Sequence, residues 1–231
     1  MLPFIDALAC GFEGEAAERG GKKAVVTGNP VRQEITKIDP PSERFAGRGG
    51  RLRLLVFGGS LGARFLNHLL PKAISLLPSD SRPEIIHQCG FKAVDEVKAL
   101  YAEAGVEAAV QPFIEDMAAA YTWSDLVLCR AGATSVSEIC SAGAASLLVP
   151  LVVKTTSHQL QNALFMEQNG ASRCLRQDTL TPERLSAVLA SIDRAQLLSM
   201  AEAARKLSHS NAASAVADMI ESRADRTFRV S

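Results

Sequence analysis

The sequence predicts an α/β fold, a doubly wound parallel sheet with helices on both faces. Two observations predict it. Short, nearly all-apolar runs alternate along the chain with segments long enough for helices, a pattern typical of parallel strands covered on both faces. The 231 residues are 47% hydrophobic, 22% charged and only 5% aromatic, with several alanine-rich stretches, so the composition is globular and favours helices over an all-β sandwich.

The strands are predicted at the apolar runs, each of which ends at a turn or a change of pattern. In the main sheet these runs are residues 51–57, 84–88, 106–113, 126–129, 145–149 and 171–175. An earlier β-type run, residues 22–27, stops at the turn Gly28-Asn29-Pro30, because proline cannot continue a strand ladder. This order predicts that the main sheet begins only after that turn.

Helices are predicted between the strands, where apolar residues recur at helical spacing. They are residues 61–77, 91–104, 117–123, 135–141 and 159–168, with further helices to about residue 222. Residues 38–50 are predicted to be a linker. The domain prediction is therefore an N-terminal or linker segment at 1–27, one Rossmann-like domain at 28–222, and a frayed tail at 223–231.

Composition excludes several function classes. Lys+Arg and Asp+Glu both number 25, and no basic run is present, so nucleic acid is not expected as the main partner. The five cysteines form no C-x-x-C pair, which indicates a reduced, cytosolic compartment. Residues 1–14 lack a basic start and are too short for a membrane span, so we expect neither a signal peptide nor a transmembrane helix. No Asp-x-Asp pair occurs, and no bound metal is predicted.

Gly58-Gly59-Ser60-Leu61-Gly62-Ala63 joins a predicted strand to a predicted helix. Small residues there let the backbone approach an anion, while the helix start supplies free N–H groups and a positive dipole end. The loop is not the G-x-G-x-x-G dinucleotide fingerprint, because positions 58, 60 and 63 are Gly, Ser and Ala. A phosphate loop is one interpretation; a tight turn that needs glycine for geometry alone is the other.

The segment 132–138 begins a second helix at a strand end. Glu138, one turn into it, is a candidate to accept hydrogen bonds from two vicinal ribose hydroxyls. The spacing Ser135-x-x-Glu138 also matches a capping box, in which the glutamate serves only its own helix. The spacing by itself favours the cap.

Weaker candidates lie in the other loops at the predicted carboxyl edge. Arg32, after a proline-stiffened turn, offers a planar cation. The main chain around Ile114 offers donors and acceptors for a base edge, with Phe113 to cover the base. Gln159 offers a carboxamide for sugar hydroxyls. Each of these has an ordinary structural explanation: an exposed cation, a core ring or a helix start.

Taken together, seven short motifs in order resemble the MurG family of bacterial peptidoglycan N-acetylglucosaminyltransferases. They are Gly28-Asn29-Pro30-Val31-Arg32, Gly58-Gly59-Ser60-Leu61-Gly62-Ala63, His87-Gln88-Cys89-Gly90, Phe113-Ile114-Glu115-Asp116-Met117, Cys129-Arg130-Ala131-Gly132-Ala133, Ser137-Glu138 and His158-Gln159-x-x-Asn162-Ala163. The resemblance implies the C-terminal, UDP-GlcNAc-binding half of a two-domain GT-B glycosyltransferase, with no bound cofactor. It favours the ribose role for Glu138 over the cap.

The resemblance also implies a set of donor-binding residues. They are Arg32, Gly59, Ser60, Leu61, Gly62, Phe113, Ile114, Met117, Gly132, Ala133, Thr134, Ser135, Val136, Ser137, Glu138, Gln159 and Asn162. The implied reaction transfers GlcNAc, with inversion, to undecaprenyl-pyrophosphoryl-MurNAc-pentapeptide (lipid I), giving lipid II for the cell wall. The full-length family is expected to be cytoplasmic and peripheral on the inner face of the membrane.

The resemblance does not cover the family's N-terminal half. Its glycine-rich loop, acceptor groove, membrane patch and candidate base have no counterpart here, so the catalytic base is unassigned and a partner domain or subunit is expected to bind lipid I. Residues 151–156 also depart from the family's more acidic loop. Two alternatives stay open: a non-catalytic donor-binding subunit of a two-chain transferase, and a protein similar to nucleotide-sugar epimerases.

Overall fold

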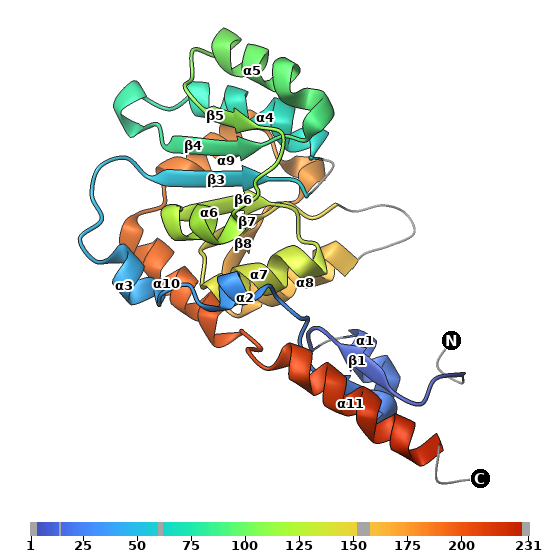
Figure 1. The fold of residues 1–231 in the computed structure, drawn as a ribbon. Helices are drawn as coiled ribbons and strands as arrows, with labels where there is room; N and C mark the ends of the chain where they lie inside the picture. Colours follow the sequence, from blue (N-terminus) through green and yellow to red (C-terminus); the bar gives the residue numbers. More distant parts are fainter. Residues whose placement is uncertain (1–3, 14, 60–61, 152–157, 228–231) are drawn as a thin grey trace.

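The computed structural model describes residues 4–13, 15–59, 62–151 and 158–227 (Figure 1). Its main body is a six-stranded, wholly parallel sheet in the order β5-β4-β3-β6-β7-β8. The strands are β3 (Arg53–Phe57), β4 (Glu84–Gln88), β5 (Ala109–Gln111), β6 (Leu126–Cys129), β7 (Ser146–Leu148) and β8 (Ser172–Cys174). The order runs outward in both directions from the neighbouring pair β3 and β6, which confirms the doubly wound fold class.

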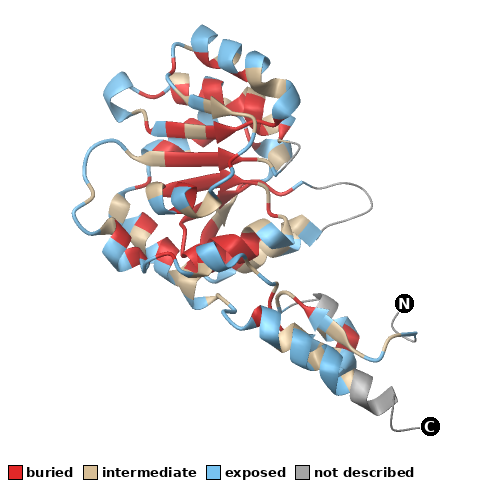
Figure 2. Ribbon diagram, viewed as in Figure 1, coloured by how far each residue is buried: buried red, intermediate tan, exposed pale blue. Residues whose placement is uncertain are grey.

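Alternate residues of the inner strands face two separate cores. On β3, Leu54 and Val56 join one core, and Leu55 and Phe57 join the other. The first core is covered by α4 (Arg64–Ser75), α5 (Val94–Glu103) and α9 (Pro182–Ala190). The second is covered by α6 (Met117–Trp123), α7 (Ala133–Ala142) and α8 (His158–Gln168). Figure 2 shows the buried strands between helices whose outer faces are exposed.

Helix ends follow ordinary capping chemistry. The Asp116 side chain accepts from the Ala119 N–H at 2.8 Å and caps α6. Asp193 and Gln196 form a capping box at the start of α10 (Arg194–Lys206), a helix that contributes to both cores. Gly143, at φ 59°, ends α7 in the left-handed conformation that favours glycine.

The predicted linker at 38–50 is not a plain linker, because it contains α3 (Pro41–Phe45) just after the four-residue helix α2 (Gln33–Thr36). Pro41 at the first helical position suits a helix start. The buried guanidinium of Arg44 donates to the carbonyls of Asp39 (3.0 Å), Tyr121 (3.2 Å) and Ala142 (2.8 Å). Tertiary hydrogen bonds, together with the packing of Ile38 and Phe45 against the two cores, hold this segment.

A buried carboxylate fastens the amino end of the sheet. Asp125 precedes β6 and has a fully buried side chain that pairs with Arg48 at 2.6 Å and Arg194 at 3.2 Å. Its Oδ2 also accepts from the main-chain N–H of Arg53 at 3.0 Å, the first residue of β3. The carboxylate therefore joins β3, β6, α10 and the loop after α3 at one point.

A small unit precedes the main sheet. In it, β1 (Leu8–Cys10) pairs in parallel with β2 (Ala24–Val26), with α1 (Glu15–Gly20) and a short 3-10 helix, Gly21–Lys23, between them. Only part of the predicted strand 22–27 is therefore extended, and β1 was not predicted. In Figure 1 this unit and the last helix, α11 (Ala212–Thr227), lie at the same end of the molecule, and α11 continues into the predicted tail at 223–231.

Other boundaries differ by a few residues. The predicted strand 106–113 shortens to β5, and the predicted helix 91–104 begins with a 3-10 turn, Phe91–Ala93, before α5. Further 3-10 turns cover Ser79–Ser81 and Gln177–Thr179. The helix predicted at 135–141 begins two residues earlier, at Ala133, and this shift changes the interpretation of Glu138.

Candidate functional site

The predicted loops meet at the carboxyl edge of the sheet. Phe57 at the end of β3 lies in register with Gln88 on one side and Cys129 on the other, so the loops after these residues are neighbours. The Gln88 side chain accepts from the Gly58 N–H at 3.3 Å and donates to the Pro112 carbonyl at 3.1 Å. This carboxamide therefore ties the loops after β3 and β5 together, a role that sequence reasoning did not assign.

The glycine loop after β3 is shaped by close backbone approach. Gly62 has φ +73°, and a Cβ there would lie 2.0 Å from the carbonyl oxygen of Cys89. Gly59 has φ +83°, and its carbonyl accepts from the Gly62 N–H at 2.9 Å. Both glycines are thus required by geometry, as the turn interpretation predicted. Ser60 and Leu61, also predicted to bind the donor, lie outside the described residues.

The helix α4 that follows this loop starts without a side-chain cap. Its N-cap is Ala63, which has no side chain able to accept from the first-turn N–H groups. The same holds for α7 after β6, where the N-cap is Gly132. Two helix starts without side-chain caps therefore follow adjacent strands at one edge of the sheet, and the positive ends of both helix dipoles lie at this edge.

The capping-box interpretation of Glu138 is wrong. Because α7 begins at Ala133, Ser135 lies inside the helix and cannot be its N-cap. The Glu138 carboxylate instead accepts from Arg32 Nη2 at 3.0 Å on Oε1 and from Tyr121 Oη at 3.4 Å on Oε2. Its side chain is 11% exposed, against 50% for Arg32. Glu138 is thus held by tertiary contacts from two other segments.

The remaining predicted residues of α7 divide between surface and core. Ala133 and Thr134 are exposed and Ser135 is half-buried, whereas the Val136 side chain is fully buried in the second core. Ser137 Oγ donates to the Ala133 carbonyl at 2.9 Å and accepts from Asn29 Nδ2 at 3.1 Å. The second contact fixes the turn that carries Arg32 against α7.

Two exposed aromatic rings stand beside this edge. Phe113, after β5, is 44% exposed, and its ring stacks on Phe91, which is 72% exposed, at 6.3 Å between centroids and 14° between planes. The hydrogen bond from the Gly90 N–H to the Pro112 carbonyl (3.2 Å) fixes the two loops together. Ile114 is buried in the second core, with only its main chain as a candidate contact. Phe91 was not predicted, because a lone ring after a glycine gives no local signal.

The two carboxamides of α8 already have partners. Gln159 Oε1 accepts from the Leu151 N–H at 2.9 Å, and Asn162 Nδ2 donates to the Ala131 carbonyl at 3.0 Å. These side chains tie α8 to the loops after β7 and β6. Of the segment 151–156 that departs from the family pattern, residues 152–156 lie outside the described part of the chain.

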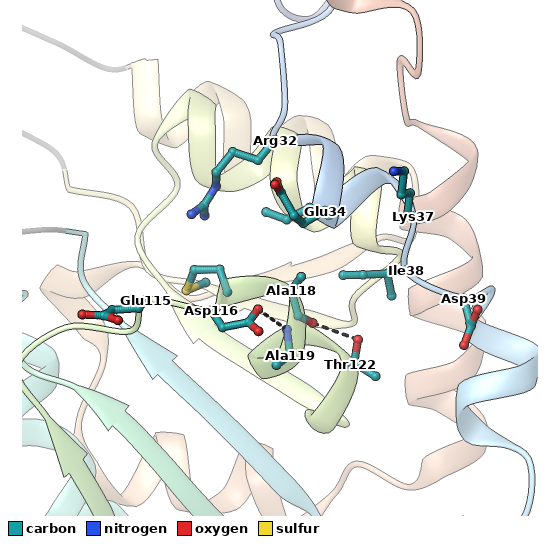
Figure 3. Close-up of a pocket in the computed structure, with 12 residues that line it drawn as sticks. Arg32, Glu34, Lys37, Ile38, Asp39, Glu115, Asp116, Ala118, Ala119 and Thr122 are labelled. Carbon is teal, nitrogen blue, oxygen red and sulfur yellow. Dashed lines mark hydrogen bonds between the residues drawn. The ribbon is translucent and has the colours of Figure 1, made fainter.

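A groove of about 660 Å³ runs between α2 and α6. Figure 3 shows Arg32, Glu34 and Lys37 on one side of it and Asp116, Ala119 and Thr122 on the other. Its lining includes four carboxylates (Glu34, Asp39, Glu115 and Asp116) but only two cations (Arg32 and Lys37). This excess of negative charge opposes a diphosphate, so the two helix starts, not the groove, are the candidate phosphate site.

The site contains two ionisable groups whose pKa values are shifted by burial. Burial, reinforced by the nearby Glu138 carboxylate, raises the pKa of Tyr121 well above its ordinary value, so the phenol stays protonated. Burial also lowers the pKa of the Arg130 guanidinium, which donates to the Val149 carbonyl at 3.1 Å and lies over the Phe65 ring. Within the described ranges, no group of three or more His, Cys, Asp or Glu side chains has the arrangement of a metal site.

The helices of the described segments are all too short or too polar to cross a bilayer.

The sequence and the fold of this chain are similar to those of known proteins. Residues 53–221 match the family described as Glycosyltransferase family 28 C-terminal domain. The UDP-N-acetylglucosamine--N-acetylmuramyl-(pentapeptide) pyrophosphoryl-undecaprenol N-acetylglucosamine transferase of Methylibium petroleiphilum is 54% identical over 223 residues, which are 96% of this chain and 60% of that protein. The transferase of the same name from Chromobacterium violaceum is 52% identical, over 96% of this chain and 61% of that protein.

Among solved structures, the crystal structure of Acinetobacter baumannii MurG superposes with a TM-score of 0.76 at 37% identity, covering 87% of this chain and 58% of that one. The chain thus spans about 60% of the length of the curated relatives named above.

Proposed function

The chain belongs to the family of glycosyltransferase family 28 C-terminal domains, and we propose that it forms the donor-binding half of an inverting N-acetylglucosaminyltransferase whose donor is UDP-GlcNAc. The names of the relatives support this substrate. The observation that carries the proposal is the pair of uncapped helix starts, α4 and α7, after the adjacent strands β3 and β6.

The two helix starts suit a leaving diphosphate. When the anomeric carbon of GlcNAc is attacked, the bond to UDP breaks and negative charge grows on the departing phosphate. Main-chain N–H groups and the dipoles of both helices stabilise that charge without a metal, each dipole by about 1 kcal/mol in a partly buried site. Gly59, which has open space where a Cβ would be, lets the diphosphate approach the backbone closely.

The ribose, the uracil and the GlcNAc of the donor are assigned to protein groups by their hydrogen-bonding chemistry and their position at the carboxyl edge of the sheet. The Glu138 carboxylate, with Arg32 displaced to a phosphate or to the base, accepts hydrogen bonds from the two ribose hydroxyls. The main chain at Ile114 binds the edge of the uracil, and Phe113 covers its face. Gln159 Oε1 already accepts from the Leu151 N–H, so the side-chain NH₂ group of Gln159 is the part that contacts GlcNAc hydroxyls.

We further propose that the acceptor is bound outside this sequence. The relatives' names specify an undecaprenol-linked N-acetylmuramyl-pentapeptide acceptor, and the relatives are longer than this chain. The general base that activates the acceptor hydroxyl therefore belongs to another domain or subunit. Because the acceptor is a membrane lipid, the working site is at the inner face of the cytoplasmic membrane.

Calorimetry with UDP and UDP-GlcNAc tests the donor site. We expect binding by the isolated chain, and we expect Glu138→Ala to weaken it about 10-fold or more, since hydrogen bonds to a charged group contribute about 1.5–3 kcal/mol. Glu84→Ala is a matched control, because Glu84 is exposed at the opposite, amino end of β4. A folded chain that binds neither nucleotide at millimolar concentration contradicts the proposal.

A further inference from the structure

We propose that Tyr121 is a positioning residue that holds the Glu138 carboxylate toward the ribose, and so sets a preference for ribonucleoside over 2′-deoxyribonucleoside diphosphates. The inference rests on the proposed function of Glu138 and deepens it. It starts from one contact, the 3.4 Å hydrogen bond from Tyr121 Oη to Glu138 Oε2.

Tyr121 is itself fixed from several sides. Its side chain is fully buried, and its ring meets the ring of Phe57 edge-on, at 6.1 Å between centroids and 88° between planes. Its main-chain carbonyl accepts from Arg44 Nη1 at 3.2 Å and from Ser124 Oγ at 3.0 Å. With ring and backbone both held, the hydroxyl has one position, directly against the carboxylate.

The two groups that hold Glu138 are unequal. Arg32 approaches Oε1 with a side chain that is half exposed, so the bound nucleotide can displace it. Tyr121 approaches Oε2 from the core, and its raised pKa keeps the phenol a proton donor throughout the physiological pH range. An ionised carboxylate has about four acceptor sites, so one bond to Tyr121 leaves enough for two hydroxyl groups.

The position of Tyr121 also links ribose and base recognition. Met117 and Tyr121 are four residues apart on α6 and therefore lie on the same side of that helix. Met117 begins the helix directly after the segment that carries Phe113 and Ile114. The short helix α6 thus carries Tyr121, which holds the ribose-binding carboxylate of Glu138. The same helix comes directly after the segment proposed to bind uracil.

The experiment compares UDP with 2′-deoxyuridine diphosphate on the full chain, by calorimetry, in wild type and in Tyr121→Phe. We expect wild type to prefer UDP by about 10-fold, the value of one good hydrogen bond to a charged group. In Tyr121→Phe the preference falls to about 3-fold or less, because the carboxylate is free to turn; affinity for UDP falls more than affinity for the deoxynucleotide, which has only the 3′-hydroxyl to lose.

Tyr101→Phe is the matched control. Tyr101 is also a buried phenol, but its hydroxyl contacts His87 at 2.9 Å on the other face of the sheet. Its loss should lower the melting temperature and leave the UDP preference unchanged. A merely structural role for Tyr121 would give the same result as this control.

The outcomes separate this inference from the proposed function. An unchanged UDP preference in a folded Tyr121→Phe, together with a preference abolished by Glu138→Ala, overturns the role of Tyr121 and leaves the donor site standing. A wild-type chain that binds neither nucleotide overturns both. If Tyr121→Phe does not fold, 3-fluorotyrosine at position 121 can replace it, because this residue keeps the ring and the hydroxyl. Its fluorine NMR resonance should shift when UDP is added, and should shift less when 2′-deoxyuridine diphosphate is added. Equal shifts contradict the inference.

Discussion

Protonation of His87 is expected to destabilise this protein in mild acid. His87 is buried on β4, where Nδ1 lies 2.9 Å from Tyr101 Oη and Nε2 lies 3.1 Å from Asn67 Oδ1. Asn67 Nδ2 donates to the Cys89 carbonyl at 3.0 Å, so Asn67 Oδ1 faces the imidazole ring. His87 Nε2 therefore carries the proton and donates to Asn67, while His87 Nδ1 accepts from the Tyr101 hydroxyl. A second proton on Nδ1 would break that arrangement and bury a charge beside neutral groups.

The magnitude follows from linkage. Burial lowers the pKa of His87 from 6.5 to about 4. As the pH falls, His87 is protonated in the unfolded chain at a higher pH than in the folded chain. The contribution of neutral His87 to the free energy of unfolding is therefore fully present above about pH 7 and is lost as the pH falls toward 4. The free energy of unfolding should therefore drop by about 2 kcal/mol between about pH 7.5 and pH 5, and by about 3 kcal/mol below pH 4.

Urea unfolding followed by circular dichroism at both pH values measures this loss, with His87→Gln as the reference. The variant has lower stability but lacks the titrating ring, and the other ionisable groups are common to both proteins. The difference between the two proteins should shrink by about 2 kcal/mol on acidification. Parallel pH profiles would refute the argument that a buried, neutral His87 supports the fold.

Three further substitutions test the glycine loop after β3 and the buried carboxylate of Asp125. Gly62→Ala should lower the free energy of unfolding by about 3 kcal/mol, because the left-handed backbone strains alanine and the new Cβ meets the Cys89 carbonyl. Gly59→Ala should lower it by only about 1–2 kcal/mol, because φ is +83° there but the space around the new Cβ is open. Thermal melts that rank the two equally would count against this account. Asp125→Asn leaves its two partly buried arginine partners without a counter-charge and should cost about 3 kcal/mol in denaturant titrations, the low end for a buried pair because both arginines keep contact with solvent; a loss under about 1 kcal/mol would show that the cluster contributes little.

The family and the fold class were predictable because both depend on local signals. The strands at 84–88 and 126–129 and the helix at 117–123 have the predicted bounds. In each, an apolar run ends at a polar, glycine or turn residue, so burial and boundary are decided within a few positions. The motifs that carry the family resemblance lie in the loops between these elements, in chain order, and the comparisons confirm it.

The contacts of the site were less predictable, because they join distant segments. Arg32 and Glu138 are separated by 106 residues, and no periodicity links them. Spacing favoured a cap for Glu138, but the helix begins at Ala133, which local pattern did not indicate. Tyr121 resembles any core aromatic until its hydroxyl is placed beside the carboxylate. The individual donor contacts stay predictions that the nucleotide experiments above address.

The charge cluster at Asp125 and the two helix starts lie at opposite ends of the same strands. β3 has five residues, so at about 3.3 Å for each step between neighbours its two ends are about 13 Å apart. Substitutions so far apart, with no shared partner, act additively. Substitutions at Asp125 should therefore change the stability of the protein without changing how the two helix starts bind a diphosphate.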